Sequence, residues 1–260
     1  MDNKPIIVIA AVVAVAGLAI AYYFHSRGTL PRVPVATQPS APPAEPAIEH
    51  PVPSPSGPTE PLPALGDSDP AMKDALAGVL GNDAVMQYLI PESIIRHIVV
   101  TVDNLPREKV PFAKRPIVAT PGPFLANGDE LHSTLDPKNF ARYEPMVSVV
   151  RKLDVQRVAQ VYLHFYPLFQ GAYQDLGYPA GYFNDRLVQV IDSLLATPQP
   201  GGAIELTRPN VMYVFADPKL EGRPAGQKLL LRMGPDNAAV IKAKLTELRA
   251  IITAAPPPKR

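Results

Sequence analysis

An apolar segment near the amino terminus constrains this chain more than any other feature. Residues 6–24 carry no charged side chain and consist mostly of Ala, Val and Ile. As a helix, the segment would be about 28 Å long, close to the roughly 30 Å hydrocarbon core of a bilayer. Three aromatic residues, 22–24, close it, as is typical of a membrane–water interface. We therefore expect residues 1–28 to be a single transmembrane anchor in the lipid bilayer.

Two questions about this anchor stay open. Lys4 and the A-x-A-like site at residues 19–21 also fit a signal peptide that is cleaved, although the apolar run is longer than the usual signal core. The orientation is weakly marked, because Lys4 lies on one side while Arg27 and Arg32 lie on the other. A short tail before one anchor favours the amino terminus in the cytoplasm and the remainder of the chain outside it.

A proline-rich tract follows at residues 29–65. About a third of its positions are proline, which lacks an amide donor and fixes φ, so neither helix nor sheet can propagate. Few apolar side chains remain to offset the entropy of ordering, and we expect a disordered linker with polyproline II character. It would span at most about 115 Å. An alternative is a ligand for SH3-type or WW-type domains, since P-x-x-P patterns occur in it.

Residues 66–254 have the length and periodicity of one mainly α-helical globular domain with a small β-hairpin. A proline-rich flexible tail, 255–260, ends the chain. Apolar periodicity and capping residues predict helices over 69–81, 83–89, from 91, from 136, 154–175, 182–196, 225–233 and 235–253. Asp69 and Asp154 are expected to cap two of them. The β-branched run at 94–102 leaves a strand as an alternative.

Two further segments of this domain are less regular. Residues 203–207 and 211–216 flank an Arg-Pro-Asn turn and predict the hairpin. Residues 109–137 show no clear period and contain several prolines, so we expect a long loop that wraps the helices or carries function.

Composition and motifs point away from several kinds of chemistry. The chain has no Cys, so disulfides, zinc fingers and cysteine nucleophiles are excluded. Its net charge of +1 gives no electrostatic reason to expect nucleic acid as a partner. The histidines of the domain, 97, 132 and 164, lack metal-ligand spacing, and scattered carboxylates are explained by capping and solvation. We expect no catalytic residue, metal or cofactor.

Aromatic residues form the densest cluster in the sequence. Those at 162, 165, 166, 169 and 173 recur at helical spacing, which favours a buried core. The Gly-Tyr-Pro-Ala-Gly-Tyr segment at 177–182 is a tight aromatic connection that would suit a groove for a peptide or glycan. The candidate partner-binding residues are Phe124, Tyr178, Tyr182 and Phe183.

Several segments carry a resemblance to a known family. They are T-V-D-N-L-P-R at 101–107, R-Y-E-P at 142–145, the aromatic segment 162–182, and L-L-R-M-G-P-D-N at 230–237. Together they resemble a proteobacterial envelope family catalogued as domain of unknown function 3014. The resemblance implies a bacterial envelope protein with one anchor and a proline-rich spacer, and it carries over no catalytic residues.

The leading hypothesis is a single-pass inner-membrane protein whose periplasmic domain binds an envelope protein or cell-wall partner. One alternative is an enzyme that acts on envelope substrates through two carboxylates in a cleft. Another is a cytoplasm-facing signalling or DNA-associated protein, because the last two helices resemble a helix-turn-helix pair with several lysines. Asp236 and Glu247 interrupt that positive charge.

Overall fold

The structure is a computed structural model in which residues 47–52, 61–129 and 132–254 are described. The expected anchor at 1–28, much of the tract at 29–65 and the tail at 255–260 lie outside the described residues. Within the described residues, no helix combines the length and apolar character needed to cross a bilayer.

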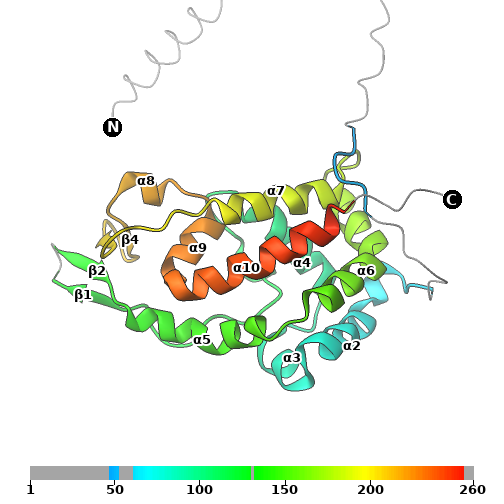
Figure 1. The fold of residues 1–260 in the computed structure, drawn as a ribbon, viewed down its shortest axis with the longest axis horizontal. Coiled ribbons are helices and arrows are strands. Elements are labelled where there is room, and N and C mark those ends of the chain that lie inside the picture. The colour runs from blue at the N-terminus through cyan, green and yellow to red at the C-terminus, as the bar shows by residue number, and fades with distance from the viewer. Residues whose placement is uncertain (1–46, 53–60, 130–131, 255–260) are drawn as a thin grey trace, which may run out of the picture. The chain divides into compact units, whose positions relative to one another are not determined.

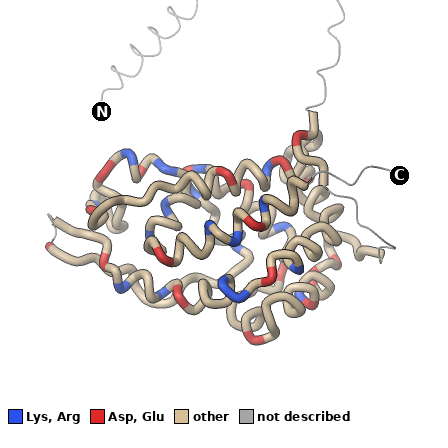
Figure 2. The backbone as a smooth tube through the Cα atoms, in the orientation of Figure 1, with Lys and Arg blue, Asp and Glu red and all other residues tan. Residues whose placement is uncertain are grey.

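The described region from residue 61 onward is a mainly helical domain with one small antiparallel sheet, which confirms the predicted class of the globular part (Figure 1). Lys, Arg, Asp and Glu are interspersed along the backbone (Figure 2). The elements are η1 (Leu65–Asp67), α2 (Asp69–Leu80), α3 (Asn82–Tyr88), α4 (Ile94–Asn104), η2 (Phe112–Lys114), β1 (Ala126–Gly128), β2 (Ser133–Leu135), α5 (Lys138–Arg151), α6 (Val155–Asp175), α7 (Phe183–Leu195), β3 (Glu205–Thr207), β4 (Val214–Phe215), α8 (Pro218–Glu221), α9 (Ala225–Met233) and α10 (Pro235–Ile252).

Capping residues explain where several helices begin. Asp154 caps α6 as predicted, and its side chain accepts the backbone N–H groups of Gln156 and Arg157. Asp69 does not cap its own helix. Its carboxylate accepts the N–H groups of Ser93 and Ile94 at 2.7 and 2.8 Å, and so it caps α4. The helix expected from residue 91 therefore begins at Ile94.

The sheet differs from the expected hairpin. β3 and β4 pair antiparallel as predicted, with Leu206 opposite Phe215, but the sheet has four strands in the order β1-β2-β3-β4. β1 and β2 come from the stretch expected to be an irregular loop, because strands of three residues are too short to show an alternating pattern. Gly128 makes their hairpin possible: its φ is 105°, and a Cβ there would lie 2.0 Å from the His132 carbonyl oxygen.

The largest core lies among α2, α4, α6 and α7, and the predicted aromatic stripe of α6 is buried in it. A second cluster joins α5, α9 and α10, and a third lies between the sheet and α9. In Figure 1 the β1–β2 hairpin lies at the opposite end of this domain from α2 and α6.

Two described parts of the proline-rich tract, in which we expected a disordered linker, pack against the domain. Val52, Leu62 and Leu65 contact the largest cluster. Residues 47–52, which are blue in Figure 1, lie beside the beginning of α7, and we call them the strap. The sequence did not indicate this packing, because only a few apolar side chains of the tract contact the core.

Candidate functional site

The connection from α6 to α7 is a tight and well-braced turn. A Cβ on Gly181 would lie 2.8 Å from Cε1 of Tyr173 and 2.9 Å from Cβ of Tyr178, so only glycine fits without movement of its neighbours. The Gln170 side chain donates to the Gly181 carbonyl at 2.7 Å and accepts the Phe183 N–H at 2.8 Å. These bonds hold the beginning of α7 against α6.

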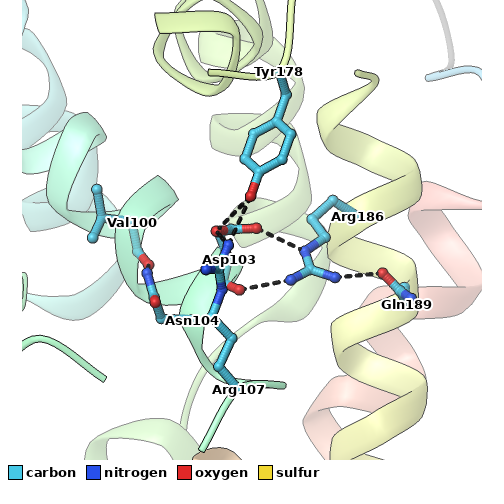
Figure 3. A network of polar contacts seen from close by, with 7 residues as sticks. All are labelled: Val100, Asp103, Asn104, Arg107, Tyr178, Arg186 and Gln189. Atoms are coloured by element: carbon cyan, nitrogen blue, oxygen red, sulfur yellow. Dashed lines mark hydrogen bonds and ion pairs between the residues drawn. The ribbon is translucent and has the colours of Figure 1, made fainter. Parts of the chain in front are cut away.

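A buried carboxylate, Asp103 at the end of α4, lies next to this connection (Figure 3). Its Oδ2 accepts Nη2 of Arg107 at 2.6 Å and the Tyr178 hydroxyl at 3.3 Å. Its Oδ1 accepts Nε of Arg186 at 3.0 Å, and its backbone carbonyl accepts Nη2 of the same arginine at 2.7 Å. Both carboxylate oxygens are thus occupied, as a buried charge requires.

The partners of this carboxylate are themselves held in place. Asp103 raises the pKa of the Arg107 guanidinium, and Tyr178 adds to the effect. Tyr178 accepts a 2.7 Å hydrogen bond from Arg107 and stacks on Tyr173 with ring centroids 4.6 Å apart. Nη1 of Arg186 donates to Gln189 Oε1 at 2.6 Å. We call Asp103, Arg107, Tyr178 and Arg186 the Asp103 network.

A pocket of about 460 Å³ lies beside this network. It is bounded by α4, α6, the α6–α7 connection, α7 and the strap. Its lining residues are Ala47, Glu49, Asp103, Tyr173, Tyr178, Ala180, Gly181, Tyr182, Asp185, Arg186 and Gln189. The pocket therefore combines three tyrosines with both signs of charge.

The strap is bound mainly through its backbone. The Asp185 carboxylate accepts the N–H of Glu49 at 3.1 Å and that of His50 at 2.6 Å. The Tyr182 hydroxyl oxygen accepts the N–H of Val52 at 3.0 Å. Between these donors lies a proline, residue 51, which has no N–H to satisfy.

Asn184, a buried residue of α7, also binds the strap. Its side chain is fully buried, and its Nδ2 donates to the His50 carbonyl at 2.8 Å and to the Ile252 carbonyl at 3.1 Å. Its Oδ1 accepts the Tyr162 hydroxyl at 2.9 Å. The same side chain therefore ties together the strap, α6 and the end of α10.

The structure brings only some of the predicted site residues together. Tyr178 and Tyr182 both line the pocket. Phe183 follows them but is 1% exposed, and its ring stacks on Phe169 inside the core. Phe124 is not near them in the packing: it belongs to the cluster between the sheet and α9, with its ring 5.8 Å from that of Tyr213.

Sequence reasoning missed the charged residues of the site: it treated Asp103 as a capping or solvated group and gave Arg107 and Arg186 no role in a site. A signal was present for Asp103, because Ile95, Val99 and Asp103 recur every four residues along the buried face of α4. A carboxylate on such a face needs a cation nearby. Arg107, four residues further along, supplies one. No sequence signal pointed to Arg186.

Three carboxylates of the domain are firmly engaged by hydrogen bonds or ion pairs. Asp103 is saturated with donors. Arg249 holds the pKa of Asp192 below its usual value through a hydrogen bond. Burial acts to raise the pKa of Glu221, but its bonds to Lys228 and to the Phe215 N–H outweigh this and lower it. Among the described residues, no three His, Cys, Asp or Glu side chains gather as metal ligands would.

Comparison with known protein families gives a match over most of the domain. A family described as "Protein of unknown function (DUF3014)" matches residues 94–249, which run from α4 into α10 and include the whole Asp103 network. The strap lies outside the matched range. Neither the curated proteins nor the solved structures gave a match. The family match covers more than half of the chain, and the protein is thus a member of the DUF3014 family.

Proposed function

We propose that this protein is a single-pass protein of the bacterial inner membrane whose periplasmic domain binds an envelope protein or cell-wall partner. The anchor is residues 1–28, with the amino terminus in the cytoplasm. The support for the anchor is the uncharged apolar run at 6–24 followed by the proline-rich tract.

The observation that carries the binding role is the pocket beside the Asp103 network. Tyrosine and arginine contribute the largest energies at protein interfaces, and here they surround one depression. The buried Asp103 carboxylate fixes the side chains of Tyr178 and Arg186, so these two need little further ordering when a partner binds. Arg107 does not line the pocket, but it donates to the hydroxyl of Tyr178, which does, and its side chain is 51% exposed.

The binding role is tested by photo-crosslinking of the full-length protein in its native membranes. A photoreactive amino acid replaces Ala180, which is exposed and lines the pocket, and in a control protein it replaces Met212, which is 73% exposed in the turn before β4. We expect a discrete adduct from position 180 only, weakened by Arg107→Ala. Equal adducts at both positions, or none at 180, would contradict the role.

The membrane anchor is tested separately. Residues 6–24 should hold the full-length protein in membranes through an alkaline carbonate wash, because a spanning helix is not released by removal of ionic contacts. Recovery of a mature chain that begins at Tyr22 would instead indicate signal cleavage.

A further inference from the structure

The strap occupies a surface that recognises the backbone of an extended peptide. Asp185 and Tyr182 accept three N–H groups from the strap, and Asn184 donates to one of its carbonyls. Each of these contacts is to a main-chain atom. Backbone recognition of this kind tolerates many side chains, as it does when peptides add to an exposed sheet edge.

Two positions of the strap nevertheless carry side-chain requirements. The residue at position 51 makes no N–H contact and is proline, which also disfavours helix for the residue before it. The next residue, Val52, packs against the largest core cluster. The surface therefore suits a segment of the form x-x-Pro-apolar, in extended conformation.

The strap contacts the domain through four main-chain hydrogen bonds and adds few apolar contacts of its own. Its Ile48 side chain is 54% exposed and Glu49 is exposed. A segment held by a few backbone hydrogen bonds and one half-buried valine is poorly anchored compared with the helices of the core.

From these contacts we propose that the strap is a displaceable latch, and that the surface of Tyr182, Asn184 and Asp185 is a binding site for an extended x-x-Pro-apolar segment of a partner protein. The proposal rests on the proposed function, because it names the recognition chemistry of the same face. The latch competes with the partner intramolecularly, at an effective concentration of about millimolar for a short linker. Partner binding then requires release of residues 47–52.

The test uses the full-length protein in detergent micelles and a fluorescein-labelled peptide with the sequence of residues 45–54. His50→Pro removes the 2.6 Å hydrogen bond to Asp185 and leaves Val52 and the surface unchanged. Loss of one bond to a charged group should weaken the latch about ten- to hundredfold. We expect the labelled peptide to bind this variant at least about tenfold more tightly than it binds the wild type.

Two carboxylate variants test the surface. Asp185→Asn, added to His50→Pro, should weaken peptide binding at least about tenfold, because one of the two acceptor oxygens becomes an NH2 donor and the charge is lost. Asp175→Asn is the control, because Asp175 pairs with Arg96 and makes no contact with the strap, and this variant should leave peptide binding unchanged. Glu49→Pro, at an exposed position, repeats the latch-release test should His50→Pro unfold.

Other outcomes overturn the proposal in distinguishable ways. Equal affinity of wild type and latch-release variants means that the strap is a permanent part of the domain. Peptide affinity that Asp185→Asn leaves unchanged means that the peptide binds elsewhere. Concentration-dependent dimers of the latch-release variant mean that a second copy supplies the strap. If the yield of the position-180 adduct is the same in the latch-release variant as in the wild type, the latch is contradicted while the proposed function stands.

Discussion

Replacement of Asp103 by Asn is the sharpest test of how the site is built. The substitution keeps the size of the side chain and removes the charge that faces Arg107 and Arg186. Breaking a buried ion pair costs about 3–5 kcal/mol, and the lower end applies here because Arg107 is half exposed. For a domain of this size, about 3 kcal/mol corresponds to a fall in Tm of roughly 6–12 °C.

The assay is thermal unfolding of the full-length protein, followed by far-UV circular dichroism. Asp175→Asn is the matched control, because Asp175 pairs with Arg96 and both side chains are about half exposed. Such surface pairs contribute about 0–1 kcal/mol, and so the control should lose at most about 4 °C. A fall for Asp103→Asn no larger than that of Asp175→Asn would refute the claim that this carboxylate organises the site.

Three further predictions concern other parts of the domain. Gly181→Ala should destabilise the protein by about 1–3 kcal/mol in chemical denaturation, because the added Cβ would meet Tyr173 and Tyr178. The control is Gly78→Ala, where the space is open, and an equal loss of stability in that variant would contradict the steric explanation. Phe124→Ala should lower Tm by roughly 4–8 °C without affecting the crosslinked adduct at position 180, since the Phe124 ring packs beside the sheet. Loss of the adduct at unchanged Tm would instead indicate that Phe124 contacts the partner. Asp192→Asn should lower the free energy of unfolding by at most about 1 kcal/mol, because the ion pair with Arg249 is partly exposed. Since folding lowers the pKa of Asp192, this loss of stability should be full above about pH 5 and should shrink as the pH falls below about 4. A loss that grows in acid would contradict the lowered pKa.

Helices could be predicted where local signals were strong. The cap at Asp154 and the aromatic period of α6 placed that helix, and Gly234 separated α9 from α10. Boundaries were less predictable where tertiary contacts decide them: Asp69 caps α4 from another helix, 24 positions away from Ser93. The first hairpin was missed because β1 and β2 are too short to show a period.

The candidate site was predicted only in its aromatic part. Tyr178 and Tyr182 stood out because aromatic residues cluster there in the sequence. The charged half was hidden, because Arg186 meets Asp103 across 83 positions of the chain and no local pattern announces such a contact. The strap was hidden for the same reason, since Val52 contacts a residue 130 positions away from within a tract whose composition indicates disorder.

Amide hydrogen exchange of the strap tests the central claim most directly. In the full-length protein the N–H groups of Glu49, His50 and Val52 donate to Asp185 and Tyr182, and they should exchange more slowly than in a free peptide of residues 45–54. An excess of that peptide should remove the protection while the amides of α6 stay protected. Free-peptide rates at all three amides without any competitor would contradict the account.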